Sequence, residues 1–265
     1  MRPDPFQLKQ ADWRQRAGKA IPSLLVGLVV LLFWQLLIIG RPSLEFLLGS
    51  PLGILNRLWT LLWAGDLFFH GSITGTEAVL GYVSGSTLGT ALGLSFWWSR
   101  NLALAVGPYL AALGATPVFA LGPILIFWFG TGITSKVVLG FLTTLGIAVF
   151  QSYRGAESAD PNLVRLTTVL GGGRWDIFSK IVAPSALVWV LAGARLNIGM
   201  ALLGAFIGEF VSSNKGLGHL IIVYEGLYDV NGIWAGVFCI GVLAIVFQAA
   251  LYPVERFAGR LIAAE

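Results

Sequence analysis

Four polar side chains lie within or at the edges of long apolar runs: Glu77, Arg195, Asn197 and Glu209. Charge inside a membrane is costly, so such residues usually mark a polar path or a paired site. They are therefore candidates for lining a solute passage. Arg195 and Glu209 are fourteen residues apart, about 21 Å along a helix, so they cannot touch each other. The alternative is that Glu77 is partly exposed and that the other two charges snorkel to the membrane surfaces.

Patterns of catalytic or metal chemistry are missing from the sequence. His70 and His219 are too few and too far apart for a metal site, and Cys239 stands alone. A phosphate-binding loop needs a preceding strand and a lysine–hydroxyl pair, which the run 171–174 lacks. No basic, aromatic-interleaved patch indicates nucleic acid. We therefore expect no catalytic residue, metal or cofactor in this chain, and a membrane-embedded enzyme is a distant alternative.

The composition is that of an integral membrane protein. Of 265 residues, 56% are hydrophobic and 11% charged, and the mean hydropathy is +0.81, which leaves too little polar surface for a soluble globule. The 34 glycines and 10 tryptophans fit this class, since glycine permits close helix packing and tryptophan favours the headgroup level. Membrane lipid is therefore an expected partner.

The apolar runs predict an all-α protein with about six transmembrane helices. The N-terminal segment 1–20 is polar and basic, and the run that follows it is long enough to span, so we interpret it as an uncleaved first helix rather than a signal peptide. Residues 21–265 then form a single transmembrane domain. The expected spans are 21–39, 72–98, 102–129 (broken by three prolines), 137–150, 187–210 and 232–252.

Basic residues give the orientation. With the N-terminus inside, twelve lysines and arginines lie in inward segments and four in outward segments. This bias follows the positive-inside rule and places both termini and the segment 155–184 in the cytoplasm.

Glycines mark helix-packing faces. Gly81, Gly85, Gly89 and Gly93 recur every fourth residue and form one groove along the second span. A neighbouring helix can lie close in this groove, either from the same subunit, which we favour, or from a second copy. Gly204 and Gly208 offer a second close-packing site.

The segment 155–184 is too polar to cross a membrane and has the pattern of two short helices. Asp160 and Pro161 predict a capped start, and Leu163, Leu166 and Leu170 form an apolar stripe. Three glycines end this helix. An anchor at the membrane surface, a plug for the groove of another protein and an ordinary solvated loop are all compatible with the pattern.

The second short helix of this segment starts at Arg174. Asp176 and Lys180 are four residues apart and can pair on one side, while Trp175 and Phe178 add aromatic surface. Pro184 is expected to end the helix.

Several sequence motifs resemble those of the binding-protein-dependent ABC transporter permeases, specifically of the group that serves nitrate, taurine, alkanesulfonates and thiamine precursors. The resemblance covers about residues 50–261. One departure lies in the loop that the family names "EAA", where this chain has Arg165-Leu166-Thr167 in place of Glu-Ala-Ala. The residues that carry the resemblance are Gly81-Tyr82, the stretch 116–136, Gly171, Arg174-Trp175, Phe178, Lys180, Pro184, Gly193, Arg195, Glu209 and Gly216-Leu217-Gly218.

The resemblance implies a type I importer permease whose loop is a coupling helix seated in a cleft of an ATPase subunit. The implied coupling residues are Glu157, Asp160, Arg165, Leu170, Gly171, Arg174, Trp175, Phe178, Lys180 and Pro184. Implied partners are two ATPase subunits that bind ATP and Mg, a second permease copy in a homodimer, and an external solute-binding protein. The location is the inner membrane.

The implied solute is small, either anionic or sulfonate-, nitrate- or pyrimidine-like. The alternative function is a stand-alone carrier or channel driven by an ion gradient. Carriers commonly show internal repeats and ionisable residues at the membrane midplane, and the sequence shows neither.

Overall fold

The computed structural model describes residues 22 and 25–263, and every regular element in that part of the chain is helical. The expected segment 1–20 lies outside it. After a first helix, Leu25–Ile38, the elements are α2 (Pro42–Leu48), α3 (Pro51–Ala64), α4 (Asp66–Trp98), α5 (Arg100–Ala115), η1 (Val118–Leu121), α6 (Gly122–Phe129), α7 (Ile133–Glu157), α8 (Pro161–Val169), α9 (Arg174–Ile177), η2 (Phe178–Val182), α10 (Ala183–Val211), α11 (Leu217–Gly226) and α12 (Val230–Ala263).

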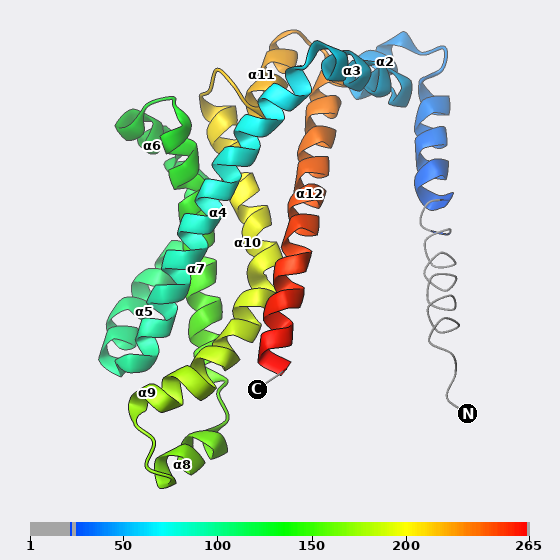
Figure 1. Cartoon of the computed structure of the whole chain (residues 1–265). Coiled ribbons are helices and arrows are strands. Elements are labelled where there is room, and N and C mark those ends of the chain that lie inside the picture. Colours follow the sequence, from blue (N-terminus) through cyan, green and yellow to red (C-terminus); the bar gives the residue numbers. More distant parts are fainter. Residues whose placement is uncertain (1–21, 23–24, 264–265) are drawn as a thin grey trace, which may run out of the picture.

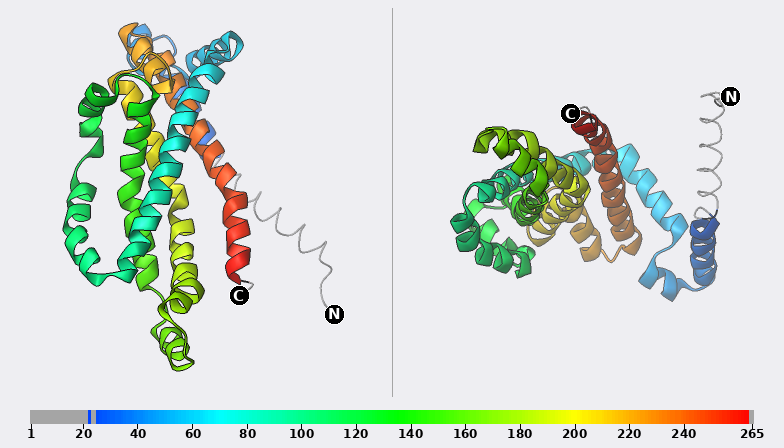
Figure 2. Two further views of the ribbon diagram at one scale, coloured as in Figure 1. Left: turned by 60° about the vertical axis from the view of Figure 1, so that its left-hand side comes forward. Right: turned by 90° about the horizontal axis from the view of Figure 1, so that it is seen from below.

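The long helices α4, α7, α10 and α12 run lengthwise through the molecule (Figure 1). At one end, named here the α8 end, α8 and α9 project beyond them, and α2, α3 and α11 lie at the opposite, α11 end (Figures 1 and 2). Among the described residues, three helical stretches are long and apolar enough to cross a membrane: Ile133–Glu157, Arg174–Val211 and Val230–Arg256. The chain is therefore an all-α membrane protein.

The first helix stands apart from the others (Figure 1). It touches the rest of the chain near the α11 end, where Trp34 and Trp234 meet edge to face at 5.6 Å and Gln35 accepts a hydrogen bond from the Leu52 backbone. Most of its apolar side chains are exposed. This exposure is suited to a lipid environment.

The region 100–129 is broken, as the prolines predict. Pro108 lies inside α5, Pro117 precedes the short η1 turn, and Pro123 occupies the first turn of α6. Proline lacks the backbone donor that would continue the helical hydrogen bonds, so the chain is interrupted around Pro117 and Pro123, whereas α5 continues through Pro108. α5, η1 and α6 then pack against α7.

The core of the fold is α7, which lies between the glycine faces of α4 and α10. A Cβ atom at Gly81 of α4 would stand 2.9 Å from the Cα of Gly140 in α7, and one at Gly204 of α10 would stand 2.8 Å from that same atom. Backbones approach this closely only where side chains are absent. The three helices therefore meet almost backbone to backbone.

The other glycines of the stripe face small residues of α7. A Cβ at Gly89 would lie 2.7 Å from the Ala148 Cβ, and Gly93 faces Ser152. On α10, a Cβ at Gly208 would lie 2.8 Å from Cγ of Lys136. The groove predicted from the sequence thus holds a helix of the same chain.

We expect Gly85→Ala to destabilise the chain by roughly 1–3 kcal/mol, the usual cost of overpacking, because the new methyl group would stand 2.7 Å from the Phe141 carbonyl oxygen. Gly71→Ala in the same helix is the matched control, since no atom of the described residues lies within 4 Å of its methyl group. Thermal unfolding in detergent should show a lower Tm for Gly85→Ala alone. Equal Tm values would show that α7 shifts to accommodate the methyl group at position 85 without loss of stability.

Candidate functional site

The loop between α7 and α10 begins with a well-capped helix, α8. The Asp160 carboxylate accepts a hydrogen bond of 2.8 Å from the Asn162 backbone N–H, and Pro161 occupies the first turn. At the other end Gly171 adopts φ = +82°, its N–H donates to the Thr168 carbonyl, and the Gly172 N–H donates to the Thr167 carbonyl at 2.9 Å. These two bonds form a Schellman motif, which requires a left-handed residue at the position of Gly171.

The apolar side chains of α8 are exposed. Leu163 is 48% exposed, Leu166 54%, Val169 84% and Leu170 77%. α8 projects beyond the long helices (Figure 1), and these side chains remain about half exposed or more. Apolar residues at a helix tip that lies outside the apolar spans are typical of a protein contact.

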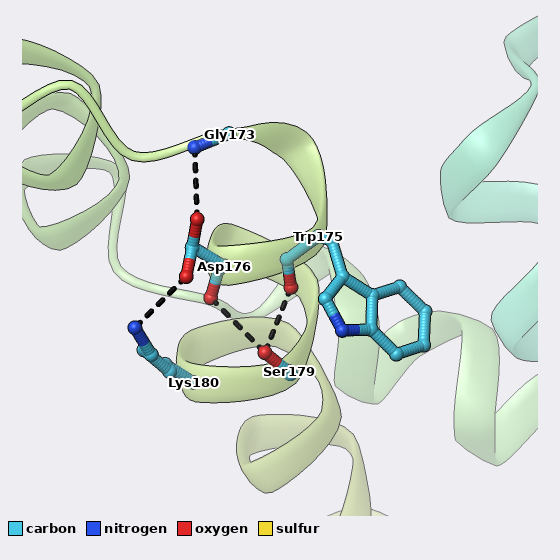
Figure 3. A network of polar contacts seen from close by, with 5 residues as sticks. All are labelled: Gly173, Trp175, Asp176, Ser179 and Lys180. Atoms are coloured by element: carbon cyan, nitrogen blue, oxygen red, sulfur yellow. Dashed lines mark hydrogen bonds and ion pairs between the residues drawn. The ribbon is translucent and has the colours of Figure 1, made fainter.

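Polar contacts order the second part of the loop (Figure 3). The Gly173 N–H donates to the Asp176 carboxylate at 3.0 Å, and the Lys180 ammonium donates to the same carboxylate at 2.8 Å. Ser179 donates to the Trp175 carbonyl. The bond from Lys180, together with that from Gly173, holds the pKa of Asp176 below its usual range. The pairing expected from the four-residue spacing is therefore present.

Pro184 does not end this helix, contrary to expectation. Residues 174–211 are continuously helical, and η2 is a turn of π-helix directly before Ala183 and Pro184. In this wider turn the Ala183 N–H donates to the Phe178 carbonyl five residues earlier. The wider turn gives room to the proline ring, which would clash in a regular α-helix.

Three side chains of α9 and η2 lie against the end of α4. The Phe178 ring is 5.5 Å from Trp97 and 5.3 Å from Trp98, centroid to centroid, and Trp175 is 6.0 Å from Trp98. The Arg174 guanidinium donates to the Trp98 carbonyl at 3.0 Å. These residues attach the loop to α4, whereas the leucines of α8 face away from the molecule.

The remaining predicted coupling residues are at the surface. Glu157 pairs with Arg154 at 3.3 Å, and both side chains are about half exposed. Arg165 is exposed on α8. Their contact with another subunit stays a prediction.

At the α11 end, Glu209 joins three helices. One of its carboxylate oxygens accepts from the Thr74 hydroxyl at 2.6 Å, and the other accepts from the Gly218 N–H at 2.7 Å. The Thr74 hydroxyl in turn accepts from the Leu217 N–H at 2.8 Å. Glu209 therefore satisfies a free N–H at the start of α11, which helices leave without an internal partner, and fixes α11 to α10 and α4.

Glu77 and Lys136 complete this buried polar cluster. Glu77 is 2% exposed and Lys136 is fully buried, and the Lys136 ammonium donates to the Thr131 carbonyl. The Oε2 atom of Glu77 finds no hydrogen-bond partner among the described residues. The sequence analysis missed Lys136. The sequence signal for it was a lysine directly before the apolar run 137–150.

The other two predicted pathway residues lie apart from this cluster. Arg195 makes a two-pronged ion pair with Glu255 of α12, at 2.9 and 2.7 Å. The Asn197 amide donates to Gln151 of α7 at 3.1 Å, beside Gly193, where any side chain would collide with that glutamine. The four residues therefore form three separate polar contacts between helices, and Arg195 and Glu209 do not meet.

The histidines occupy the α11 end as well. Nδ1 of His70 accepts from the Gly216 N–H at 3.0 Å, and the rings of His70 and His219 stack 6.2 Å apart. Within the described chain, no group of three or more His, Cys, Asp or Glu side chains is arranged to hold a metal ion.

The sequence is similar to transport proteins. Residues 81–258 match the family described as "Binding-protein-dependent transport system inner membrane component". The chain is 32% identical to the riboflavin transport system permease protein RibX of Chloroflexus aurantiacus, over 86% of this chain and 85% of that protein. It is 31% identical to the formylaminopyrimidine transport permease protein ThiX of Halalkalibacterium halodurans, over 91% and 96%.

The fold is similar to that of solved transporter structures. One is the MetNI methionine ABC transporter in an inward facing conformation, with a TM-score of 0.60 and 16% identity over 75% of this chain and 98% of that chain. Another is an amino acid ABC transporter crystallised with histidines, also with a TM-score of 0.60. At this identity the likeness concerns the fold alone.

We expect Glu209→Ala to cost about 3–5 kcal/mol of stability, as removal of one partner from a buried charged network does. The substitution leaves the Gly218 N–H without its acceptor in the interior, and the Thr74 hydroxyl keeps only its longer bond to the His70 carbonyl. Glu225→Ala, at an exposed position of α11, is the control. Thermal unfolding in detergent measures both, and an equal Tm for the two variants would mean that the cluster does not hold α11 in place.

Proposed function

The chain belongs to the family of binding-protein-dependent transport system inner membrane components, and we propose that α8 is the coupling helix through which a separate ATPase subunit drives it. The protein is a transmembrane permease of an ABC importer for small solutes. The observation that carries the proposal is the exposed apolar surface of α8, formed by Leu163, Leu166, Val169 and Leu170.

Two further features support an energy source outside this chain. The sequence contains no phosphate-binding loop. In addition, both ends of α8 are capped and Val164 packs against the core below it, so the helix is held in place while its leucines stay at the surface. In place of Glu-Ala-Ala, the chain has Arg165 and Leu166 at exposed positions and Thr167 at a half-buried one, and Leu166 is part of the apolar stripe.

A groove of about 790 Å³ between α5, η1, α7 and α10 is the proposed half of the solute passage. Its lining is mostly apolar and includes Leu142, Thr143, Met200 and Leu203. A second permease copy facing this groove would enclose it. None of the four polar residues first considered for the passage lines the groove, so we assign them to helix packing instead.

The proposed solute is small, and anionic, sulfonate-like or pyrimidine-like. Relatives of the chain are named for riboflavin, formylaminopyrimidine and aliphatic sulfonates. Selection among such solutes falls to an external binding protein, which would dock at the α11 end. The α8 end is then cytoplasmic, and the last described residues lie toward that end (Figure 1).

The purified chain alone is expected to hydrolyse no ATP, because it has no phosphate-binding loop. The same chain reconstituted with ATPase subunits should bind them and support hydrolysis. Leu166→Asp places a charge on the contact surface and should abolish the binding, while Leu227→Asp, at an exposed leucine directly after α11, should leave it unchanged. Retained binding by Leu166→Asp, or ATP turnover by the chain alone, would contradict the assignment.

Gly171→Val should impair coupling without preventing membrane insertion. Valine at φ = +82° is strained by roughly 1–3 kcal/mol, and the strain disturbs the Schellman motif that orients α8. Asparagine tolerates this conformation, so Gly171→Asn is the matched variant, and no described atom obstructs either side chain at its Cβ. In reconstituted vesicles, binding of the ATPase subunits should be weaker for Gly171→Val and unchanged for Gly171→Asn. Equal binding by both would show that this turn does not orient α8.

A further inference from the structure

We infer that Trp97 and Trp98, the last two residues of α4, are positioning residues that make α4 move with the coupling loop. The inference rests on the proposed function of α8. α10 continues directly from the loop and therefore moves with it. The inference identifies α4 as a second helix that the loop displaces.

The contact between the loop and α4 is made by four aromatic rings and one cation. Besides the contacts of Phe178 and Trp175 with the tryptophans, the Trp175 and Phe178 rings are 5.6 Å apart. The Arg174 guanidinium lies 5.7 Å from the Trp97 ring and 5.4 Å from the Trp98 ring. Arginine over tryptophan is a favourable cation–π arrangement. The hydrogen bond from the Arg174 guanidinium to the Trp98 backbone carbonyl adds direction to this contact.

The contact reaches α8 through the apolar core beneath it. Ala156, Ile177, Val182 and Ala186 form this core, and Trp97, Phe178 and Val164 of α8 pack against it. A displacement of α8 therefore presses on Trp97 through packed side chains. Packed interiors are close to incompressible, so they transmit such displacements.

α4 carries the displacement to the α11 end as one uninterrupted helix of 33 residues. Its glycine face is packed closely against α7, and at its far end Thr74 bonds both Glu209 and the start of α11. α4 thus joins the loop to the surface at which the external binding protein would dock.

The test uses the whole chain reconstituted in vesicles with its ATPase subunits. Ser72→Cys places a reporter thiol at an exposed position of α4 toward the α11 end, and Cys239→Ala removes the native thiol. The measurement is the rate at which a membrane-impermeant thiol reagent labels Ser72→Cys, with and without Mg-ATP and vanadate. Binding of the ATPase subunits is measured in parallel.

Trp98→Ala should retain ATPase binding, because the leucines of α8 are intact, and should lose the ATP-dependent change in labelling. Trp98→Phe keeps an aromatic ring against Phe178 and should restore that change. Loss of the change in Trp98→Ala while ATPase binding is retained is what a purely structural role would not predict. Trp128→Ala, at an exposed tryptophan of α6, is the control and should leave the labelling change as it is in the reporter chain with Trp98.

The reference for each comparison is the reporter chain with Trp98 intact. The inference is overturned if Trp98→Ala shows the same ATP-dependent change in labelling as this chain, or if Trp98→Phe loses the change as fully as Trp98→Ala. It is also overturned if labelling of the reporter chain with Trp98 does not respond to ATP. If Trp98→Ala does not fold, Arg174→Gln decides, because Arg174 is exposed and an unchanged ATP response there overturns the inference. Failure of the unmodified chain to bind ATPase subunits would instead refute the proposed function.

Discussion

The structure depends on the close approach of three helix backbones at Gly140. Gly81 of α4 and Gly204 of α10 face this residue from two sides, so α7 lies between two helices without intervening side chains. In a membrane such contact replaces the hydrophobic effect as the source of helix association. The positions of the segment that joins α7 to α10 and of the end of α4 follow from this arrangement.

Each end of the packed helices carries a different kind of contact. At the α11 end, buried hydrogen bonds of Glu209 and Thr74 join α4, α10 and α11. At the α8 end, exposed aromatic rings join α4 to the loop. The first kind is rigid because a broken bond leaves a polar group buried. The second kind relies on ring packing and on the bond from the Arg174 guanidinium to the Trp98 carbonyl.

The sequence by itself determined the class of the fold and most of its local structure. Long apolar runs predict spans because the bilayer accepts only helices whose backbone bonds are satisfied internally. The start of α8 at Asp160 and its end at Gly171 were predicted from capping chemistry, which depends on neighbouring residues alone. The glycine stripe showed that a helix packs there, and left open which helix.

Only the tertiary structure decided the partners of side chains distant in sequence. It placed Lys136 beside Glu77 and Glu209, turned Trp175 and Phe178 toward α4, and paired Arg195 with Glu255. It also continued the helix through Pro184 by a π turn. Each of these outcomes depends on which helix faces which across the bundle. Periodicity in one chain segment gives the face that a side chain occupies, but the residue opposite that face is set by packing.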